Sequence, residues 1–312
     1  MRRGNELPVP APSCAGGRVV REPGTPVPGA QRPGARPCPC AGMAGAIRST
    51  LWRMRRSPLI ALHLVLAVAL GGAAGLYFGH TVWDAQLSCD AFMQLVGAGA
   101  PLLVGLSCGL AIDAEREAGA YANLLGAVSR RRVLFALGAV LLMLGVLAAA
   151  LATGVFAALM ALSGRDLPAL AAFAQALAGI AAGSACLYAL ALAIVLRWGR
   201  NVAIAAGALG FMGALMSIGG LANGLVTGTF SGAMAGGATA WIPIVWPVRL
   251  ASLAMEGAIA ATSARADFVA QLPALQAAGR EVAIACATVT VPAVVCGLAV
   301  ANRFEDTRRG GE

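Results

Sequence analysis

The chain has 312 residues, of which 59% are hydrophobic and 12% are charged, and its mean hydropathy is +0.77. Because an ordinary soluble domain carries about 25% charged residues, this composition excludes a typical soluble enzyme and indicates a membrane protein. The formal net charge is +9, all 23 basic residues are arginines, and the absence of lysine excludes a P-loop lysine, a Schiff base and a Ser–Lys dyad.

The first 42 residues differ in composition from the rest of the chain. They are rich in Pro, Gly and Arg and have almost no apolar periodicity, so residues 1–42 are expected to form a disordered extension. They lack the apolar segment of a signal peptide, and the single residue between Cys38 and Cys40 does not fit a zinc knuckle or a thioredoxin-like pair. The abrupt change indicates an over-extended gene start, with Met43 as the true first residue.

The segment after Met43 has an apolar face. Ile47, Leu51 and Met54 lie near one side of a helix, with Trp52 and several arginines beside them. This pattern predicts a short interfacial helix on the inner leaflet of the membrane. An irregular, positively charged anchor is an equally good interpretation of the same residues.

Six apolar runs follow, and each reaches the roughly 20 residues that a helix needs to cross a bilayer. They are Pro58–Phe78, Ala91–Ile112, Val133–Leu162, Ala169–Leu196, Val202–Ala222 and Val282–Ala301. None of the runs has the polar face that a soluble helix of this length would need. We therefore expect an all-α polytopic membrane protein with six transmembrane helices, formed by residues 43–305 and followed by a short tail at 306–312.

Two features inside these runs invite a chemical interpretation. His63 ionises near neutral pH, but the runs contain no carboxylate for proton exchange, so we favour a neutral structural histidine over a proton-driven carrier. The string Gly105-Leu-Ser107-Cys108-Gly109 matches a nucleophile elbow, although no strand precedes it and no sequence argument places a histidine beside Ser107. The two glycines instead have the spacing of a helix-packing face. Cys and His spacing across the sequence predicts no metal site.

The segment between the second and third runs, residues 113–132, is a compact amphipathic unit. Tyr121, Leu124, Leu125 and Val128 fall at i, i+3, i+4 and i+7 and form one apolar stripe. Acidic residues precede the stripe and three arginines follow it, which suits the helix dipole. The pattern predicts a short cytoplasmic helix that a soluble partner can hold. A solvated loop whose arginines only set the topology fits the same composition.

The arginines between the runs predict the topology. Thirteen lie on one side: Arg48, Arg53, Arg55, Arg56, Arg116, Arg130, Arg131, Arg132, Arg197, Arg200, Arg303, Arg308 and Arg309. Four lie on the other: Arg165, Arg249, Arg265 and Arg280. Because cytoplasmic loops carry the excess of basic residues, we expect both termini and residues 113–132 in the cytoplasm and residues 225–280 outside. This placement explains the basic charge without a nucleic-acid partner.

The outer segment between the fifth and sixth runs complicates the span count. It has no charged residue from 201 to 248, so residues 225–246 are apolar enough to cross as well. The stretch is rich in glycine and contains two prolines, and one extra crossing would place the C-terminus outside. We therefore expect a re-entrant segment, with Trp241 and Trp246 at the outer interface where their polar edges stay in water. Simple interfacial anchoring by the same tryptophans is the alternative.

Three ionisable residues, His80, Asp84 and Asp90, lie near the expected outer surface. Asp90 is expected to cap the second span. The group suits attraction of a cationic peptide, while solvated loop charges are the simpler interpretation.

The loop sequence carries a resemblance to a known family. The pattern Glu115-Arg116-Glu117-x-Gly119, followed by Leu124-Leu125 and Ser129-Arg130, resembles the first cytoplasmic loop of ABC-2-type transporter permeases. Those permeases are six-span subunits with cytoplasmic termini, an interfacial helix before the first span and a long outer segment between the last two spans. The string Trp241-Ile-Pro243-Ile-Val-Trp246-Pro247-Val-Arg249 is similar to the outer segment of lantibiotic self-protection permeases. The extension, the missing lysine after the loop and the Ala/Gly-rich spans depart from the family pattern.

The resemblance implies a permease subunit of a bacterial cell-membrane ABC exporter that removes a cationic lantibiotic-like peptide from the membrane. The loop residues would couple the subunit to a separate ATPase that binds ATP and Mg, and the outer string would cap the pathway. The chain itself has no Walker loop and is expected to bind no cofactor. A second permease subunit and membrane lipids are the other implied partners. Alternatives are an export permease for another drug or lipid-like molecule and a non-transporting membrane scaffold.

Overall fold

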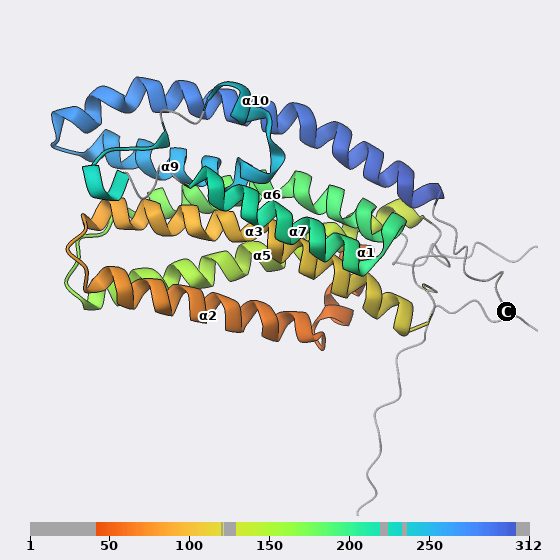
Figure 1. Cartoon of the computed structure of the whole chain (residues 1–312). Helices are drawn as coiled ribbons and strands as arrows, with labels where there is room; N and C mark the ends of the chain where they lie inside the picture. The colour runs from red at the N-terminus through yellow and green to blue at the C-terminus, as the bar shows by residue number, and fades with distance from the viewer. Residues whose placement is uncertain (1–41, 120, 122–128, 219–223, 233–235, 304–312) are drawn as a thin grey trace, which may run out of the picture. The chain divides into compact units, whose positions relative to one another are not determined.

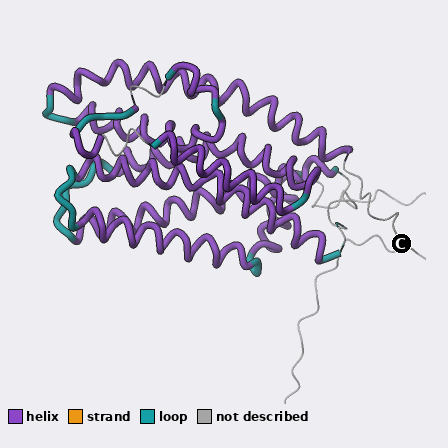
Figure 2. The backbone as a smooth tube through the Cα atoms, in the orientation of Figure 1, coloured by secondary structure: helices purple, strands orange, loops and turns teal. Residues whose placement is uncertain are grey.

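The computed structural model describes residues 42–119, 121, 129–218, 224–232 and 236–303. Within these ranges every regular element is a helix and no strand occurs (Figure 1, Figure 2), which confirms the all-α class. The predicted 1–42 extension, apart from its last residue, and the 306–312 tail lie outside the described residues. The helices are α1 (Met43–Met54), α2 (Pro58–Gly79), α3 (Ala85–Glu117), α5 (Arg130–Leu162), α6 (Leu170–Trp198), α7 (Arg200–Ser217), the 3-10 helices η3 (Gly237–Trp241) and η4 (Pro243–Val245), α9 (Trp246–Thr262) and α10 (Ala266–Arg303).

Seven helices of the described chain are long and apolar enough to span a membrane. Six of them correspond to the predicted runs, and the seventh, Pro243–Thr262, combines η4 with α9. The structure therefore shows a multi-pass helical membrane protein with one more candidate span than the sequence predicted.

Several helix boundaries differ from the predicted ones. α3 begins at Ala85 and α10 at Ala266, both well before the apolar runs expected there, and α7 ends at Ser217. Charged residues bounded the apolar runs in the sequence, but a charged side chain does not interrupt the backbone hydrogen bonds of a helix. The helices of this protein therefore extend beyond the apolar runs, and the ends of the runs do not mark the ends of the helices. The predicted helix after Met43 is confirmed as α1, and its position at the membrane surface stays a prediction.

The start of α3 corrects one sequence expectation. The side chain of Asp84, and not that of Asp90, caps the helix: its Oδ1 accepts from the backbone N–H groups of Gln86 at 2.9 Å and Leu87 at 3.0 Å. Asp90 lies one turn further along, where it is only 4% exposed. A buried carboxyl group inside a helix needs another explanation than capping.

Small residues set the close helix contacts. A Cβ atom added to Gly71 of α2 would lie 2.3 Å from the Ala152 carbonyl oxygen of α5. At Gly105 of α3 it would lie 2.6 Å from the Ala203 carbonyl oxygen of α7 and 3.0 Å from the Cα atom of Gly207. The interpretation of Gly105 as part of a packing face is therefore confirmed.

α9 begins deep within the helix bundle. An added Cβ atom at Gly97 of α3, or at Gly183 of α6, would lie less than 3.0 Å from the backbone of Pro247. Both glycines lie well inside their helices, so the first turn of α9 starts between α3 and α6 at some distance from either helix end. Protein covers 61% of the apolar window of α9, against 28% for α2 and 22% for α10. α9 is thus an internal helix.

Candidate functional site

Three groups of residues stand out in the described chain, and α3 contributes to each. The first is a charged cluster at the C-terminal end of α3, formed by Arg53, Asp113, Glu115, Arg116 and Arg200, here called the terminal cluster. Arg53 of α1 forms an ion pair with Glu115. Asp113 accepts from Arg116 at 2.6 Å and from Arg200 of α7 at 2.5 Å. Charged contacts therefore join α1, α3 and α7 at this end of the bundle.

The terminal cluster changes the expected roles of the loop residues. Glu115, Arg116 and Glu117 form the last turn of α3 and do not start a separate helix. Glu115 and Arg116 take part in ion pairs inside the protein, whereas Glu117 and Gly119 are exposed. Leu124 and Leu125, which the sequence placed in the same element, lie outside the described residues.

Arg53, Asp113 and Arg200 have a part in this cluster that the sequence did not assign. Asp113 and Arg200 stand at the ends of two predicted spans on the same side of the membrane. Opposite charges at such neighbouring span ends were an available signal for the pair.

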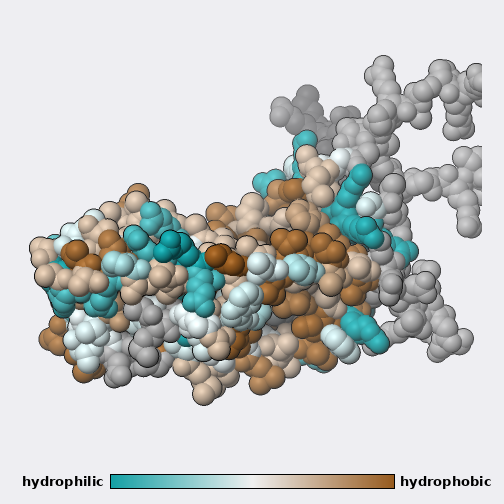
Figure 3. Space-filling model, turned by 90° about the horizontal axis from the view of Figure 1, so that it is seen from above, coloured by the Kyte–Doolittle hydropathy of each residue, from teal (hydrophilic) through white to brown (hydrophobic). Residues whose placement is uncertain are grey.

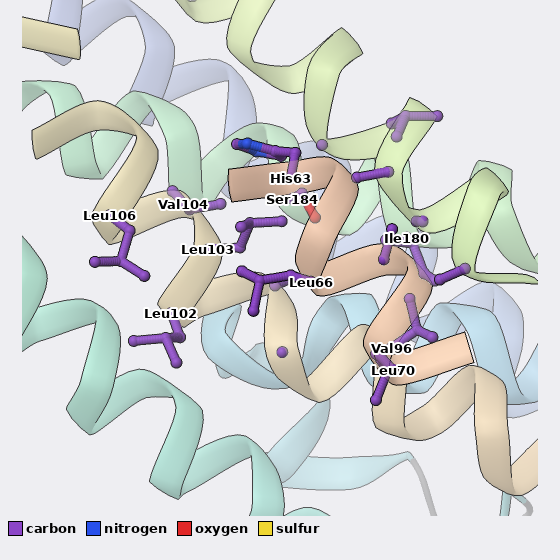
Figure 4. Close-up of a pocket in the computed structure, with 18 of the residues that line it drawn as sticks. His63, Leu66, Leu70, Val96, Leu102, Leu103, Val104, Leu106, Ile180 and Ser184 are labelled. Atoms are coloured by element: carbon purple, nitrogen blue, oxygen red, sulfur yellow. The ribbon is translucent and has the colours of Figure 1, made fainter. Parts of the chain in front are cut away.

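The second group lines a largely apolar cavity of about 310 Å³ between α2, α3, α5 and α6. Figure 4 shows the labelled side chains around it, with His63, Leu66 and Leu70 from α2, Val96 and Leu103 from α3, and Ser184 from α6. The polar side chains in the cavity lining are those of His63, Ser184 and Tyr188. A cavity with this lining suits an aliphatic or aromatic group better than a charged one.

His63 lies beside Ser107, an arrangement that the sequence did not predict. The His63 Nε2 atom is 3.2 Å from the Ser107 Oγ atom, and the His63 Nδ1 atom is 2.7 Å from the Leu59 carbonyl oxygen. A neutral ring with its proton on Nδ1 donates to the Leu59 carbonyl oxygen. The structure thus places a histidine beside Ser107, which no sequence argument could do.

The geometry around Ser107 still favours packing over catalysis. The Ser107 hydroxyl is 2.6 Å from the Leu103 carbonyl oxygen one turn earlier, the usual hydrogen bond of a serine within a helix. Ser107 stands in the middle of α3, where the neighbouring backbone N–H groups bond within the helix and cannot form an oxyanion hole.

The third group is a set of polar side chains, here called the carboxyl cluster, formed by the buried residues Asp90, Gln94, Ser252 and Glu256 and the half-buried Ser231. Asp90 and Gln94 belong to α3, and Ser252 and Glu256 belong to α9. The side-chain amide of Gln94 is 2.7 Å from Asp90 Oδ2, 2.9 Å from Ser252 Oγ and 3.3 Å from Ser231 Oγ. Glu256 is completely buried and accepts from Ser231 and from the backbone N–H of Gly232. The cluster fastens the segment at 231–232 to α9 and α3.

The sequence missed the carboxyl cluster because its members are far apart in the chain, with Gln94 and Ser252 separated by 158 positions. One available signal was the isolation of Glu256, the only acidic residue between positions 168 and 266. Asp90 and Glu256 lie outside the predicted apolar runs, but both belong to helices that are long and apolar enough to span a membrane. Among the described residues, no group of three or more His, Cys, Asp or Glu side chains could hold a metal ion.

The predicted outer string Trp241, Pro243, Trp246, Pro247 and Arg249 spans η3, η4 and the first turn of α9. Trp246 is fully buried, and its indole N–H donates to the Ala240 carbonyl oxygen at 2.7 Å, so the expectation of a water-facing edge is wrong for this residue. Trp241 is 52% exposed. Trp246 has become a packing residue because the adjacent Pro247 fits between α3 and α6 and directs the chain inward.

Comparison with known proteins gives no relative for this chain: no family model, no curated protein and no solved structure matches it. The class that the structure itself defines is a helical, multi-pass membrane protein.

Proposed function

We propose that the chain is the permease subunit of an ABC-2-type exporter whose ATP and Mg are bound by a separate ATPase subunit. The observation that best supports this function is that α3 is long and contributes residues to all three groups described above. Its 33 residues extend over about 50 Å at 1.5 Å per residue. One helix therefore carries the charged cytoplasmic end, a wall of the apolar cavity and two members of the carboxyl cluster. A displacement at Glu117 would be transmitted along this one continuous helix to the cavity wall.

The terminal cluster supports this coupling role. Arg53 links α1 to Glu115, and Arg200 links α7 to Asp113, so α1 and α7 follow a displacement of the end of α3. The arginines of these pairs are 35% to 46% exposed, so water screens the contacts and they can rearrange during a transport cycle.

The proposed topology has six spans, both termini in the cytoplasm, and α9 as the ascending arm of a re-entrant outer segment. α9 starts well inside the bundle beside Gly97 and Gly183, and it is covered mainly by protein. The part of α10 before Val282 contains the charged pair Arg280 and Glu281, which suits a position outside the bilayer. On the face in Figure 3, strongly hydrophobic residues are densest in the half toward the C-terminal end of α10.

The proposed substrate is an amphipathic, lantibiotic-like cationic peptide, and the export protects its producer. The resemblance of the outer string supports the peptide, and the apolar cavity supports a substrate that arrives from the membrane. The same apolar lining favours a second candidate, a drug or lipid-like substrate without a peptide backbone. Neighbouring genes for an ATPase and for lanthionine synthesis would favour the peptide.

The test uses Glu117→Arg, because Glu117 is exposed and forms no ion pair in the described chain. A reversed charge at a docking surface repels the partner, so co-purification of the cognate ATPase should fall at least tenfold. Resistance of the cells to the peptide should fall with it. Asp166→Arg, at an exposed carboxylate in the loop between α5 and α6, is the matched control and should change neither quantity. Unchanged complex formation and resistance in Glu117→Arg would contradict the coupling role.

A further inference from the structure

We propose that Asp90 and Glu256 form a proton-binding site, in which one proton on Asp90 joins the two carboxyl groups and holds the segment at 231–232 closed. Nothing in the exporter proposal requires these two groups, so the two proposals can fail separately. The proton would come from the outer solution, because the cluster lies toward the end of the bundle where α3 begins and α9 ends.

The hydrogen bonds of Glu256 identify it as the ionised partner. Its Oε1 atom accepts from the Ser231 backbone N–H at 2.8 Å and from the Ser231 hydroxyl at 3.1 Å. Its Oε2 atom accepts from the Gly232 backbone N–H at 2.8 Å. Both oxygens therefore receive donors, which is the arrangement that stabilises a carboxylate.

The hydrogen bonds of Asp90 are incomplete in a way that one proton would repair. Its Oδ2 atom accepts from Gln94, but its Oδ1 atom is buried and has no donor among the described residues. The side chain of Asp90 lies within hydrogen-bonding reach of both Ser252 and Glu256. A proton on Oδ1 of Asp90 would donate a hydrogen bond to the Glu256 carboxylate. Oδ1 would then have a partner, and Glu256 would gain one more donor.

No basic side chain of the described chain forms an ion pair with Asp90 or Glu256. Two negative charges in contact inside a buried site repel strongly, as in other carboxyl pairs that share a proton. The other titratable groups on the surrounding elements are Asp84 and Cys89 on α3, Arg165 after α5, Arg249 on α9, Arg265 before α10, and Asp267, Arg280 and Glu281 on α10.

Several of these groups already have other partners. Arg165 donates to the Trp83 carbonyl oxygen, Arg265 pairs with Asp267, and Glu281 accepts from the Gly237 backbone N–H. Asp90 is 4% exposed and Glu256 is fully buried, so the site suits a ligand as small as a proton.

Release of the proton would open the segment that Glu256 holds. Two adjacent carboxylates would repel each other, and the three hydrogen bonds to Ser231 and Gly232 depend on Glu256 keeping its position. This segment lies between α7 and η3, on the chain that leads into the first turn of α9. A more alkaline outer solution should therefore loosen the outer end of the protein, and a more acidic one should keep it closed.

The first experiment is infrared spectroscopy of the full chain in lipid nanodiscs over a pH titration. The C=O stretching band of a neutral carboxyl group should persist at neutral pH and disappear at alkaline pH. Asp90→Asn should remove this band, and Asp166→Asn, at an exposed carboxylate, should leave it unchanged. Absence of the band from the wild-type protein at neutral pH, or its persistence in Asp90→Asn, would overturn the proposal.

The second experiment measures hydrogen exchange of the Ser231 and Gly232 amides, corrected for the intrinsic effect of pH. Wild-type protection should fall at least tenfold as the infrared band disappears. Asp90→Asn should stay protected at every pH, because its amide N–H donates to Glu256 as the protonated carboxyl group would. Glu256→Gln should lose protection at every pH, because its amide group cannot accept from all three donors.

Two outcomes of the exchange experiment would contradict the proton site. One is a pH dependence in Asp90→Asn equal to that of the wild-type protein. The other is a protection that follows the sodium concentration at fixed pH, since that would identify a metal cation as the ligand. If Asp90→Asn does not fold, the wild-type titration still decides, because the band and the protection must change at the same pH.

Discussion

Replacement of Gly105 by alanine should weaken the packing of α3 against α7, and the same change at Gly99 should not. The added Cβ atom at Gly105 would lie 2.6 Å from the Ala203 carbonyl oxygen, so the helices must separate by about 0.8 Å to reach an ordinary 3.4 Å contact. The obstacle is backbone, which cannot rotate away as a side chain can. Overpacking of this kind typically costs about 1–3 kcal/mol, and 2 kcal/mol is a roughly 30-fold change in the folded-to-unfolded ratio.

Gly99 provides the matched control because it lies on the same helix and a Cβ atom there meets nothing within 4 Å. Gly99→Ala should be neutral or stabilising by about 0.5–1 kcal/mol, since alanine is the better helix former. The assay is reversible unfolding of the purified variants in mixed detergent micelles, followed by circular dichroism. Equal stability of Gly105→Ala and Gly99→Ala would refute the packing of α3 on α7, as would a greater loss in Gly99→Ala.

Three other predictions follow from the structure. Trp246→Phe should lower the free energy of unfolding by about 1 kcal/mol, because the hydrogen bond to Ala240 is lost. Trp246→Ala should lower it by about 3–5 kcal/mol, because the buried ring is lost. Equal unfolding curves for the two variants would contradict the burial of Trp246. A membrane-impermeant thiol reagent should label a cysteine placed at Ala264 in intact cells and spare one placed at Ala127, and the opposite pattern would reverse the topology. Deletion of residues 1–42 should leave membrane insertion unchanged, as a fractionation experiment can measure, and loss of insertion would refute Met43 as a sufficient start.

The class of protein could be predicted because it depends on hydrophobicity summed over many residues. An apolar run of about 20 residues can only be buried or surrounded by lipid, whatever the details of packing. The ends of the helices could not be predicted in this way. α3 extends through Asp90 because neighbouring protein covers this carboxyl group, which the sequence alone does not reveal.

α9 was missed because the sequence considered residues 225–246 as the extra crossing, whereas the seventh candidate span is Pro243–Thr262, and because the two prolines were interpreted as breaks. Pro247 instead occupies the first turn of the helix, where a missing N–H and a fixed φ angle are tolerated. The prolines thus mark where the helix begins. The buried position of Trp246 follows from this start between α3 and α6, and the sequence does not contain that information locally.

The loop pattern around Glu115 was predictable in part. The sequence identified the charged end of the second span, but it treated Glu115, Arg116 and Glu117 as equivalent. The structure separates them, because ion pairs with Arg53 and Asp113 engage the first two and leave Glu117 exposed. Such a distinction requires knowledge of which helix ends meet, as does the pairing of Asp90 with Glu256.

The most direct test of the exporter proposal is the removal of a fluorescent cationic lantibiotic from membranes that contain this chain and its ATPase. In inverted membrane vesicles, addition of ATP and Mg should lower the amount of peptide retained by the lipid. Vesicles with a hydrolysis-deficient ATPase should retain all of it. Equal retention with and without ATP would contradict the account, and ATP-dependent loss of a lipid-like probe in place of the peptide would assign the transporter to the alternative substrate class.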